Sequence, residues 1–235
     1  MMIFMNKKIK YDLVLKNGSV VLPEGIKTVD IGILNESIKD IGDLSGADTH
    51  DSIDCSGLHV LPGVIDSQVH FREPGLENKE NLESGMLAAA AGGVTAVFEM
   101  PNTNPLTITP ETIKDKLKRA SRVAWTDYAF YLGGTGRTGP NLGEWENAPG
   151  ICGIKIFMGA STGDLLAASD EEVASVLSNG KRVVAVHAED QYIMEANMKT
   201  ILKDNHDVSL HCKWRSPESC LSATKRVVMI AKKYN

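Results

Sequence analysis

The chain has 235 residues, of which 43% are hydrophobic and 23% charged, and its formal net charge is -5 at pH 7. This composition is typical of a globular protein with a sizeable core, and the lack of a basic excess argues against nucleic-acid binding. No apolar run approaches the roughly 20 residues of a membrane span, and the apolar start at residues 1–5 is too short for a secretion signal. The four cysteines form no C-x-x-C pair, so we expect buried, reduced thiols in a cytoplasmic protein.

Short apolar runs separated by turns fill residues 9 to about 58. The runs at 11–15, 19–22, 28–33 and 37–41 predict strands. Asn17-Gly18 predicts a hairpin turn between the first two runs, and Pro23-Glu24-Gly25 predicts the next turn. Residues 1–58 are therefore expected to form a small β module that packs beside a larger part, because so few residues bury little core.

From His59 onward the pattern becomes strand, loop and helix in repetition. Strands are predicted at 60–71, 94–100, 128–132, 153–158 and 182–187, and helices near 80–91, 110–122, 170–179, 190–204 and 217–233. Thr109-Pro110 and Ser169 are typical helix starts. Alternating strands and helices predict an α/β fold with a parallel sheet, whose carboxyl-terminal strand ends hold the functional site.

The first of these strands leads into Asp66–Gly75, with the sequence D-S-Q-V-H-F-R-E-P-G. The period of two in a strand predicts that Asp66, Gln68, His70 and Arg72 share one face. Such polar groups are costly to bury unless they bind something, and a metal ion with an anionic ligand would account for them. Gln68 is the exception, because imidazole is the better metal ligand at that position.

Less specific interpretations of these residues remain open. A lone histidine at a strand end is often only a hydrogen-bonded structural residue, as His70 could be. Arg72 has the planar fork that suits a carboxylate, but a surface ion pair with Glu73 or Glu77 is the alternative.

Lys155 interrupts the apolar run at 154–158. A lysine buried in a covered strand has a shifted pKa or a charged partner. A neutral amine can add carbon dioxide to form a carbamate, an anionic oxygen ligand able to bridge two metal ions. Pairing with a carboxylate, or extension to the rim, is the alternative that the chemistry of the residue alone favours.

Two further side chains follow predicted strands. His187 is a candidate metal ligand, with Glu189 or Asp190 as its outer partner. Asn102, in the M-P-N-T segment, either donates to an anionic substrate or caps a turn.

Four segments together resemble the dihydroorotases of the amidohydrolase superfamily. They are P-G-V-I-D-S-Q-V-H-F-R-E-P-G (62–75), G-G-V-T-A-V-F-E-M-P-N-T-N-P (92–105), G-I-K-I-F-M-G-A-S-T-G (153–163) and V-V-A-V-H-A-E-D (183–190). Hydantoinases and allantoinases share this scaffold, but F-R-E-P-G together with M-P-N-T looks most like a dihydroorotase. The resemblance runs from about residue 10 to the end of the sequence.

The resemblance implies a fold and a chemistry. The fold is a partial (β/α)8 TIM barrel of about five units over residues 59–235, with part of a β-sandwich over residues 1–58. One or two zinc ions are implied, bound by His70 and His187 and bridged by carboxylated Lys155 if there are two. Arg72 and Asn102 are placed on the carboxylate of a small-molecule substrate. The implied reaction interconverts N-carbamoyl-L-aspartate and dihydroorotate in pyrimidine biosynthesis.

Two departures from the family pattern matter. The family has His-x-His where this chain has Gln68-Val69-His70, and a glutamine oxygen is a weak zinc ligand. The family also takes a histidine ligand from the sixth barrel strand and an aspartate general base from the eighth, which this sequence does not reach. We therefore assign no catalytic base and expect the chain as given to be inactive.

Two alternatives to a dihydroorotase are kept. One is a non-catalytic dihydroorotase-like subunit that holds aspartate transcarbamoylase, a lineage in which loss of the first histidine would be tolerated. The other is a hydantoinase-like or allantoinase-like hydrolase of another cyclic ureide, against which Arg72 and Asn102 argue. Homodimers are common in the family, and neither a membrane nor a nucleic acid is an expected partner.

Overall fold

The computed structural model describes residues 10–159, 165–202 and 207–234. It divides into two compact units, Met1–Gly63 and Val64–Asn235. The strand predicted at 60–71 is in fact two elements, because β5 (His59–Val60) pairs with β1 of the first unit and β6 (Val64–Val69) belongs to the sheet of the second. Pro62-Gly63 lies between them, and proline has no N–H to continue a ladder.

The first unit is one sheet with the order β3-β2-β1-β4, and β5 also pairs with β1. Its strands are β1 (Lys10–Leu22), β2 (Gly25–Leu34), β3 (Ser37–Gly42) and β4 (Asp48–Asp54). The hairpin predicted at Asn17-Gly18 is wrong, because β1 runs through it with a register shift between Leu15 and Gly18. Asn17 takes a positive φ of 60° there, and its N–H donates to Asp30, so the extra residue forms a bulge rather than a turn.

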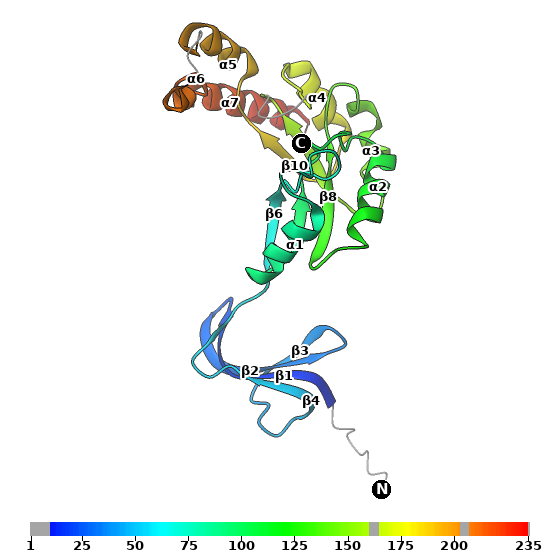
Figure 1. The fold of residues 1–235 in the computed structure, drawn as a ribbon, viewed down its shortest axis with the longest axis vertical. Helices are drawn as coiled ribbons and strands as arrows, with labels where there is room; N and C mark the ends of the chain where they lie inside the picture. The colour runs from blue at the N-terminus through cyan, green and yellow to red at the C-terminus, as the bar shows by residue number, and fades with distance from the viewer. Residues whose placement is uncertain (1–9, 160–164, 203–206, 235) are drawn as a thin grey trace. The chain divides into compact units, whose positions relative to one another are not determined.

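The second unit is a partial (β/α) barrel of five parallel strands in the order β10-β9-β8-β7-β6 (Figure 1). After β6 come β7 (Val94–Glu99), β8 (Asp127–Gly133), β9 (Ile151–Phe157) and β10 (Val184–His187). The predicted fold class and the number of strand-helix units are confirmed.

Helices lie between successive strands of this sheet and after its last strand. They are α1 (Leu82–Ala91), α2 (Pro110–Ala120), α3 (Leu142–Trp145), α4 (Asp170–Asn179), α5 (Gln191–Asn197), α6 (His211–Trp214) and α7 (Pro217–Tyr234). Thr109 and Ser169 form capping boxes at α2 and α4, as the sequence predicts. The helix predicted at 190–204 ends as α-helix at Asn197 and continues as a π-helix over Met198–Leu202; residues 203 and 204 lie outside the described residues. The short α3 and α6 were not predicted.

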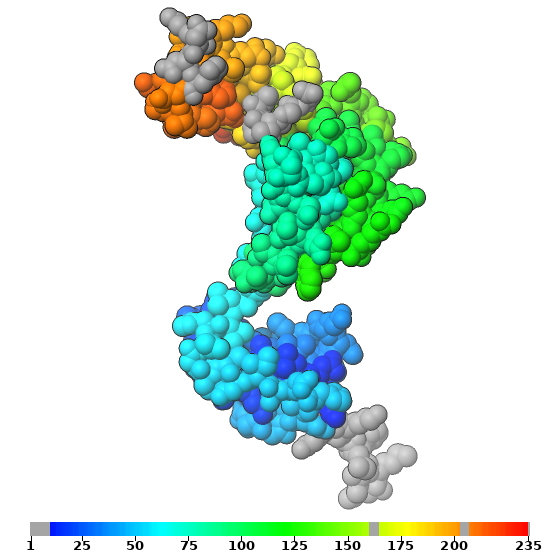
Figure 2. Space-filling view, in the orientation of Figure 1, coloured from blue at the N-terminus to red at the C-terminus, as the bar shows by residue number. Residues whose placement is uncertain are grey.

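The core of the second unit lies between the sheet and its helices. Phe130, Leu132, Ile154 and Ile156 of the strands are buried in one hydrophobic cluster with residues of α1, α2, α4 and α7. In the space-filling view the described residues of the second unit form one continuous body, coloured from cyan through green and yellow to orange (Figure 2). None of the helices in the described ranges is long and apolar enough to cross a membrane.

The prediction of buried cysteines is only partly correct. Cys55 is buried and Cys152 is half-buried, but Cys212 and Cys220 are exposed. Both exposed thiols lie on helices, α6 and α7, whose outer faces meet solvent. All four are free thiols.

Candidate active site

The loops that follow β6 and β7 are joined by main-chain hydrogen bonds. The N–H of Met100 donates to the carbonyl of Val69, and the N–H of Asn104 donates to the carbonyl of Pro74, both at 2.9 Å. Gly75 adopts a φ of +90°, and a Cβ there would lie 2.0 Å from the Asn104 carbonyl oxygen. Only glycine permits this close approach, so the two loops form one rigid platform at the carboxyl ends of adjacent strands.

His70 is held on this platform by Asn102. The Oδ1 atom of Asn102 lies 2.7 Å from Nδ1 of His70, and Asn102 is only 7% exposed. Because an amide oxygen only accepts, Nδ1 carries the proton and Nε2 keeps its lone pair. Burial lowers the pKa of His70, the Asn102 hydrogen bond opposes this, and the charges of Arg72, Lys155 and Lys116 lower it further. The ring is therefore held neutral, the state in which imidazole binds a metal.

Arg72 carries an unsatisfied buried group. Its Nη1 is buried and has no hydrogen-bond partner in the described structure. The neighbouring Glu73 instead accepts from the N–H of Leu82 at 3.0 Å and lies 3.5 Å from Arg119. The ion pair between Arg72 and Glu73 or Glu77 does not form among the described residues, and the guanidinium remains available to an anion.

The prediction that Asp66, Gln68, His70 and Arg72 share one strand face is wrong. Strand β6 ends at Val69, and its register with β7 shifts between Asp66 and Val69. Asp66 causes the irregularity, because its Oδ1 accepts the N–H of Gln68 at 3.0 Å, which removes that N–H from the ladder. Gln68 is exposed, and Arg72 lies in a loop with a φ of +68°.

Lys155 is buried without a counter-charge. It is 3% exposed, and its Nζ lies 4.8 Å from the centre of the Phe157 ring. Its register neighbours are two small residues, Gly133 and Ala185, and no hydrogen bond or ion pair to the Lys155 side chain occurs within the described ranges. Burial lowers its pKa. Neither alternative, a carboxylate partner or an exposed ammonium, is found in this part of the structure.

His187, at the end of β10, contacts Glu189 rather than Asp190. Its Nε2 lies 2.5 Å from Oε2 of Glu189, and Arg215 donates through Nε to Oε1 of the same carboxylate at 3.1 Å and through Nη2 to Oε2. In the tautomer whose Nε2–H donates to this carboxylate, Nδ1 carries the lone pair. Burial acts to raise the pKa of Glu189, but the bonds from Arg215 and His187 outweigh it and lower the pKa. Asp190 instead caps α5 and binds Arg226.

The candidate residues form two groups. His70, Asn102 and Arg72 lie on the platform, while Lys155 and His187 flank Phe157, whose ring centre is 5.9 Å from that of His187. Among the described residues no three His, Cys, Asp or Glu side chains converge on one point. The donor set nevertheless fits zinc, because Lys155 is an unpartnered amine whose carbamate would add oxygen ligands to the free nitrogens of His70 and His187.

Two important contacts were not foreseen. Lys116 of α2 forms an ion pair with Glu99 of β7, with Nζ 2.8 Å from Oε2. The interruption of the apolar strand 94–100 by Glu99 was the signal available in the sequence. Arg215, by contrast, reaches Glu189 from 26 residues away, and nothing in its local sequence indicates that contact.

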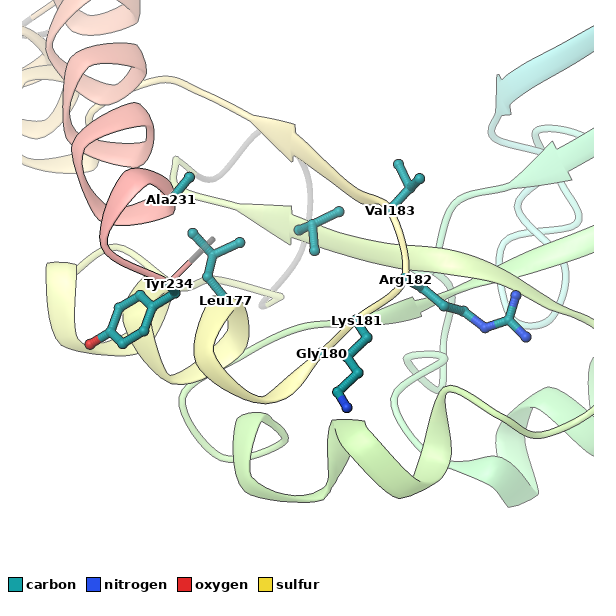
Figure 3. A pocket seen from close by; sticks show the side chains of 8 residues that line it. Leu177, Gly180, Lys181, Arg182, Val183, Ala231 and Tyr234 are labelled. Carbon is teal, nitrogen blue, oxygen red and sulfur yellow. The ribbon is translucent and has the colours of Figure 1, made fainter.

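A cavity of about 470 Å³ lies away from these residues, at the amino-terminal end of β10 between α4 and α7 (Figure 3). Its labelled side chains include the aliphatic Leu177, Val183 and Ala231, the aromatic Tyr234, and the basic Lys181 and Arg182. The Nε of Arg182 donates to the main-chain carbonyl of Glu146. Among the described residues no histidine or carboxylate lines the cavity, so this lining offers no set of metal ligands.

Comparison with known proteins identifies the family. Residues 57–142 match the family model described as dihydro-orotase-like. The dihydroorotase of Thermococcus kodakarensis is 36% identical over 227 residues, which cover 95% of this chain and 48% of that protein. The chain belongs to the dihydroorotase-like family.

Proteins with other names are also similar to this chain. The allantoinase of Deinococcus radiodurans is 36% identical over 185 residues, covering 76% of this chain and 41% of that protein. The solved structure of the L-hydantoinase from Arthrobacter aurescens matches with a TM-score of 0.89 and 29% identity, covering 95% of this chain and 51% of that one. The chain thus spans about half the length of the relatives it matches, which include proteins named for three substrates.

Proposed function

We propose that the protein is a metal-dependent cyclic amide hydrolase of the dihydroorotase type, acting between N-carbamoyl-L-aspartate and dihydroorotate. The observation that carries the hydrolase class is Lys155, an ammonium 3% exposed with no described hydrogen bond or ion pair. Such a group is strongly destabilised as a cation. Its neutral form can attack carbon dioxide: a bond forms from Nζ to carbon, one C–O electron pair moves to oxygen, and Nζ releases a proton. The resulting carbamate is an anionic ligand.

Each residue then has one task. The carbamate of Lys155, Nε2 of His70 and Nδ1 of His187 would hold one or two zinc ions. When bound, zinc supplies Lewis-acid polarisation of the ring carbonyl and lowers the pKa of the attacking water. Asn102 holds the His70 ring in the tautomer that leaves Nε2 free. We assign no general base among the described residues.

Arg72 supports a substrate that bears a carboxylate. Its buried Nη1 without a described partner would gain a charge-assisted bond from an anionic group. Dihydroorotate carries such a group. The similarity to allantoinases of 34–39% identity supports a second candidate, a hydrolase of an uncharged cyclic ureide, for which Arg72 would have no partner.

The lysine chemistry is tested with ¹³C-labelled bicarbonate and carbon NMR on the full chain. A carbamate resonance is expected in the native chain and in the exposed-lysine control Lys181→Met, but not in Lys155→Met. Zinc binding should require bicarbonate in the first two proteins and be weak in the third. A carbamate signal that survives Lys155→Met would contradict the assignment.

The substrate class is tested by comparing the binding of dihydroorotate and hydantoin to the zinc-loaded chain. Preference for dihydroorotate, lost in Arg72→Met, supports the dihydroorotase assignment. Equal binding of both rings, unchanged in Arg72→Met, supports the second candidate.

A non-catalytic subunit that binds aspartate transcarbamoylase is the alternative proposal, and it rests on Gln68 in place of histidine. Zinc-free protein that forms a stable complex with the transcarbamoylase would support it. Zinc binding with hydrolysis would exclude it. Restoring the histidine by Gln68→His should strengthen zinc binding if this position belongs to the metal site.

A further inference from the structure

The ion pair of Glu99 and Lys116 is buried at the start of the loop that follows β7. Lys116 and Glu99 are each 1% exposed, and the Nζ atom of Lys116 also lies 3.4 Å from the main-chain carbonyl of Met100. The Lys116 ammonium also contacts the Phe130 ring, whose centre is 5.2 Å from Nζ. Met100 is followed by Pro101 and then Asn102, so one contact of this lysine lies two residues from the side chain that holds His70.

The ion pair of Glu99 and Lys116 is not explained by fold stability alone. The second oxygen of the carboxylate, Oε1 of Glu99, is buried and has no hydrogen-bond partner among the described residues. Burial raises the pKa of Glu99 and lowers that of Lys116. A buried ion pair with incomplete hydrogen bonding is often no more stable than an apolar pair of similar size, so the advantage of this pair is expected to lie in geometry.

Glu99 is the counter-charge of Lys116, and further cations lie near this pair. Arg72 and Lys116 act electrostatically on Glu99, and Arg72, Lys116 and Lys155 act on His70. Two cations, Arg72 and Lys116, therefore act on both Glu99 and His70, and the direct contact of Glu99 is to Lys116.

We propose that Glu99 and Lys116 are positioning residues. Lys116, held by Glu99, contacts the Met100 carbonyl. This contact sets the position of Asn102, so that its oxygen accepts Nδ1–H of His70 and Nε2 is left free. The inference deepens the proposed function, since the free Nε2 is the proposed zinc ligand. The hydrogen bond itself is present without metal, so it can be tested separately.

The test is the tautomer of His70 in the metal-free full chain, read from two-bond ¹⁵N–¹H correlations of the ring. The native chain should show Nδ1–H. In Glu99→Leu/Lys116→Met, which removes both charges, the ratio of the Nδ1–H to the Nε2–H form should fall about threefold to tenfold, the value of one hydrogen bond. The control Lys114→Met, at an exposed position on the same helix, should leave the ratio unchanged.

A double variant that melts cooperatively near the native temperature and keeps the native tautomer ratio would overturn the proposal, because the pair would then be structural only. If the double variant does not fold, Lys116→Met alone provides the readout, because it removes the donor to the Met100 carbonyl and should lower the ratio of the Nδ1–H to the Nε2–H form. A tautomer ratio in Lys116→Met equal to that in Lys114→Met would contradict the role given to the Met100 contact. Failure of the native chain to bind zinc would refute the proposed function while leaving the tautomer result intact.

Discussion

The Oδ1 atom of Asn102 lies 2.7 Å from Nδ1 of His70, although 32 residues separate the two in the chain. The contact joins the residues that follow two neighbouring parallel strands, β6 and β7. The M-P-N-T segment therefore supports a histidine side chain in addition to forming a turn. Asn102 is thus placed to orient His70, a role distinct from the substrate contact that the family resemblance implies.

Asn102→Ala should weaken zinc binding by about 10- to 100-fold, the usual effect of removing a residue that orients a metal-bound histidine. The measurement is competition with a chromophoric chelator in bicarbonate buffer. The control is Asn104→Ala in the same loop, at an exposed position, which should bind zinc as the native chain does. Equal affinities in the two variants would show that the Asn102 contact has no effect on the site.

Lys155→Met should raise the free energy of unfolding by about 1–3 kcal/mol at neutral pH in carbonate-free buffer, because it removes an unpartnered buried charge. Urea titration monitored by circular dichroism measures this. A loss of stability would mean that the ammonium has a favourable partner in the folded state.

The pH dependence follows from the lowered pKa of Lys155. At pH values between the pKa of Lys155 in the folded chain and its pKa in the unfolded chain, the unfolded chain binds more protons. The free energy of unfolding contributed by Lys155 therefore rises with pH in this range. The destabilisation by the buried ammonium is complete below the pKa of Lys155 in the folded chain. It disappears above the pKa in the unfolded chain, about 10.4. The stability difference between Lys155→Met and the native chain should therefore shrink as the pH rises from 7 toward 10. A difference that is constant over this range would contradict a lowered pKa.

Glu99→Leu should destabilise the fold by about 3–5 kcal/mol, because it leaves the Lys116 ammonium buried without its counter-ion. Adding Lys116→Met in the same chain should recover most of that loss. Thermal and urea unfolding of both variants measure the effect. Additive losses in the double variant would show that the two side chains do not act as a pair.

Arg215→Met should lower the free energy of unfolding at pH 7 by about 1.5–3 kcal/mol, the value of hydrogen bonds to a charged group. Glu189 has a lowered pKa in the folded state, so its stabilisation is present above the unfolded pKa and is lost as the pH falls through the folded one. The difference from the native chain should accordingly narrow below about pH 4. Lys213→Met, at an exposed position on α6, is the matched control and should show no such loss.

Local signals predicted most elements of the second unit. The capping boxes at Thr109 and Ser169 are contained within four residues of sequence, so their helix starts could be predicted. Asn17-Gly18 was assigned wrongly because the same dipeptide suits a turn and a bulge. The difference was decided by Asp30, 13 residues away, which accepts the N–H of Asn17.

The sequence by itself determined the alternation of strands and helices, the family motifs and the types of side chain at the strand ends. Only the tertiary structure decided their partners: Asn102 for His70, Glu189 with Arg215 for His187, and neither a hydrogen bond nor a counter-charge for Lys155 within the described residues. The physical reason is that helix caps and strand periodicity depend on neighbours in the chain. Burial and hydrogen bonding depend instead on strand register and on packing between residues that are distant in sequence.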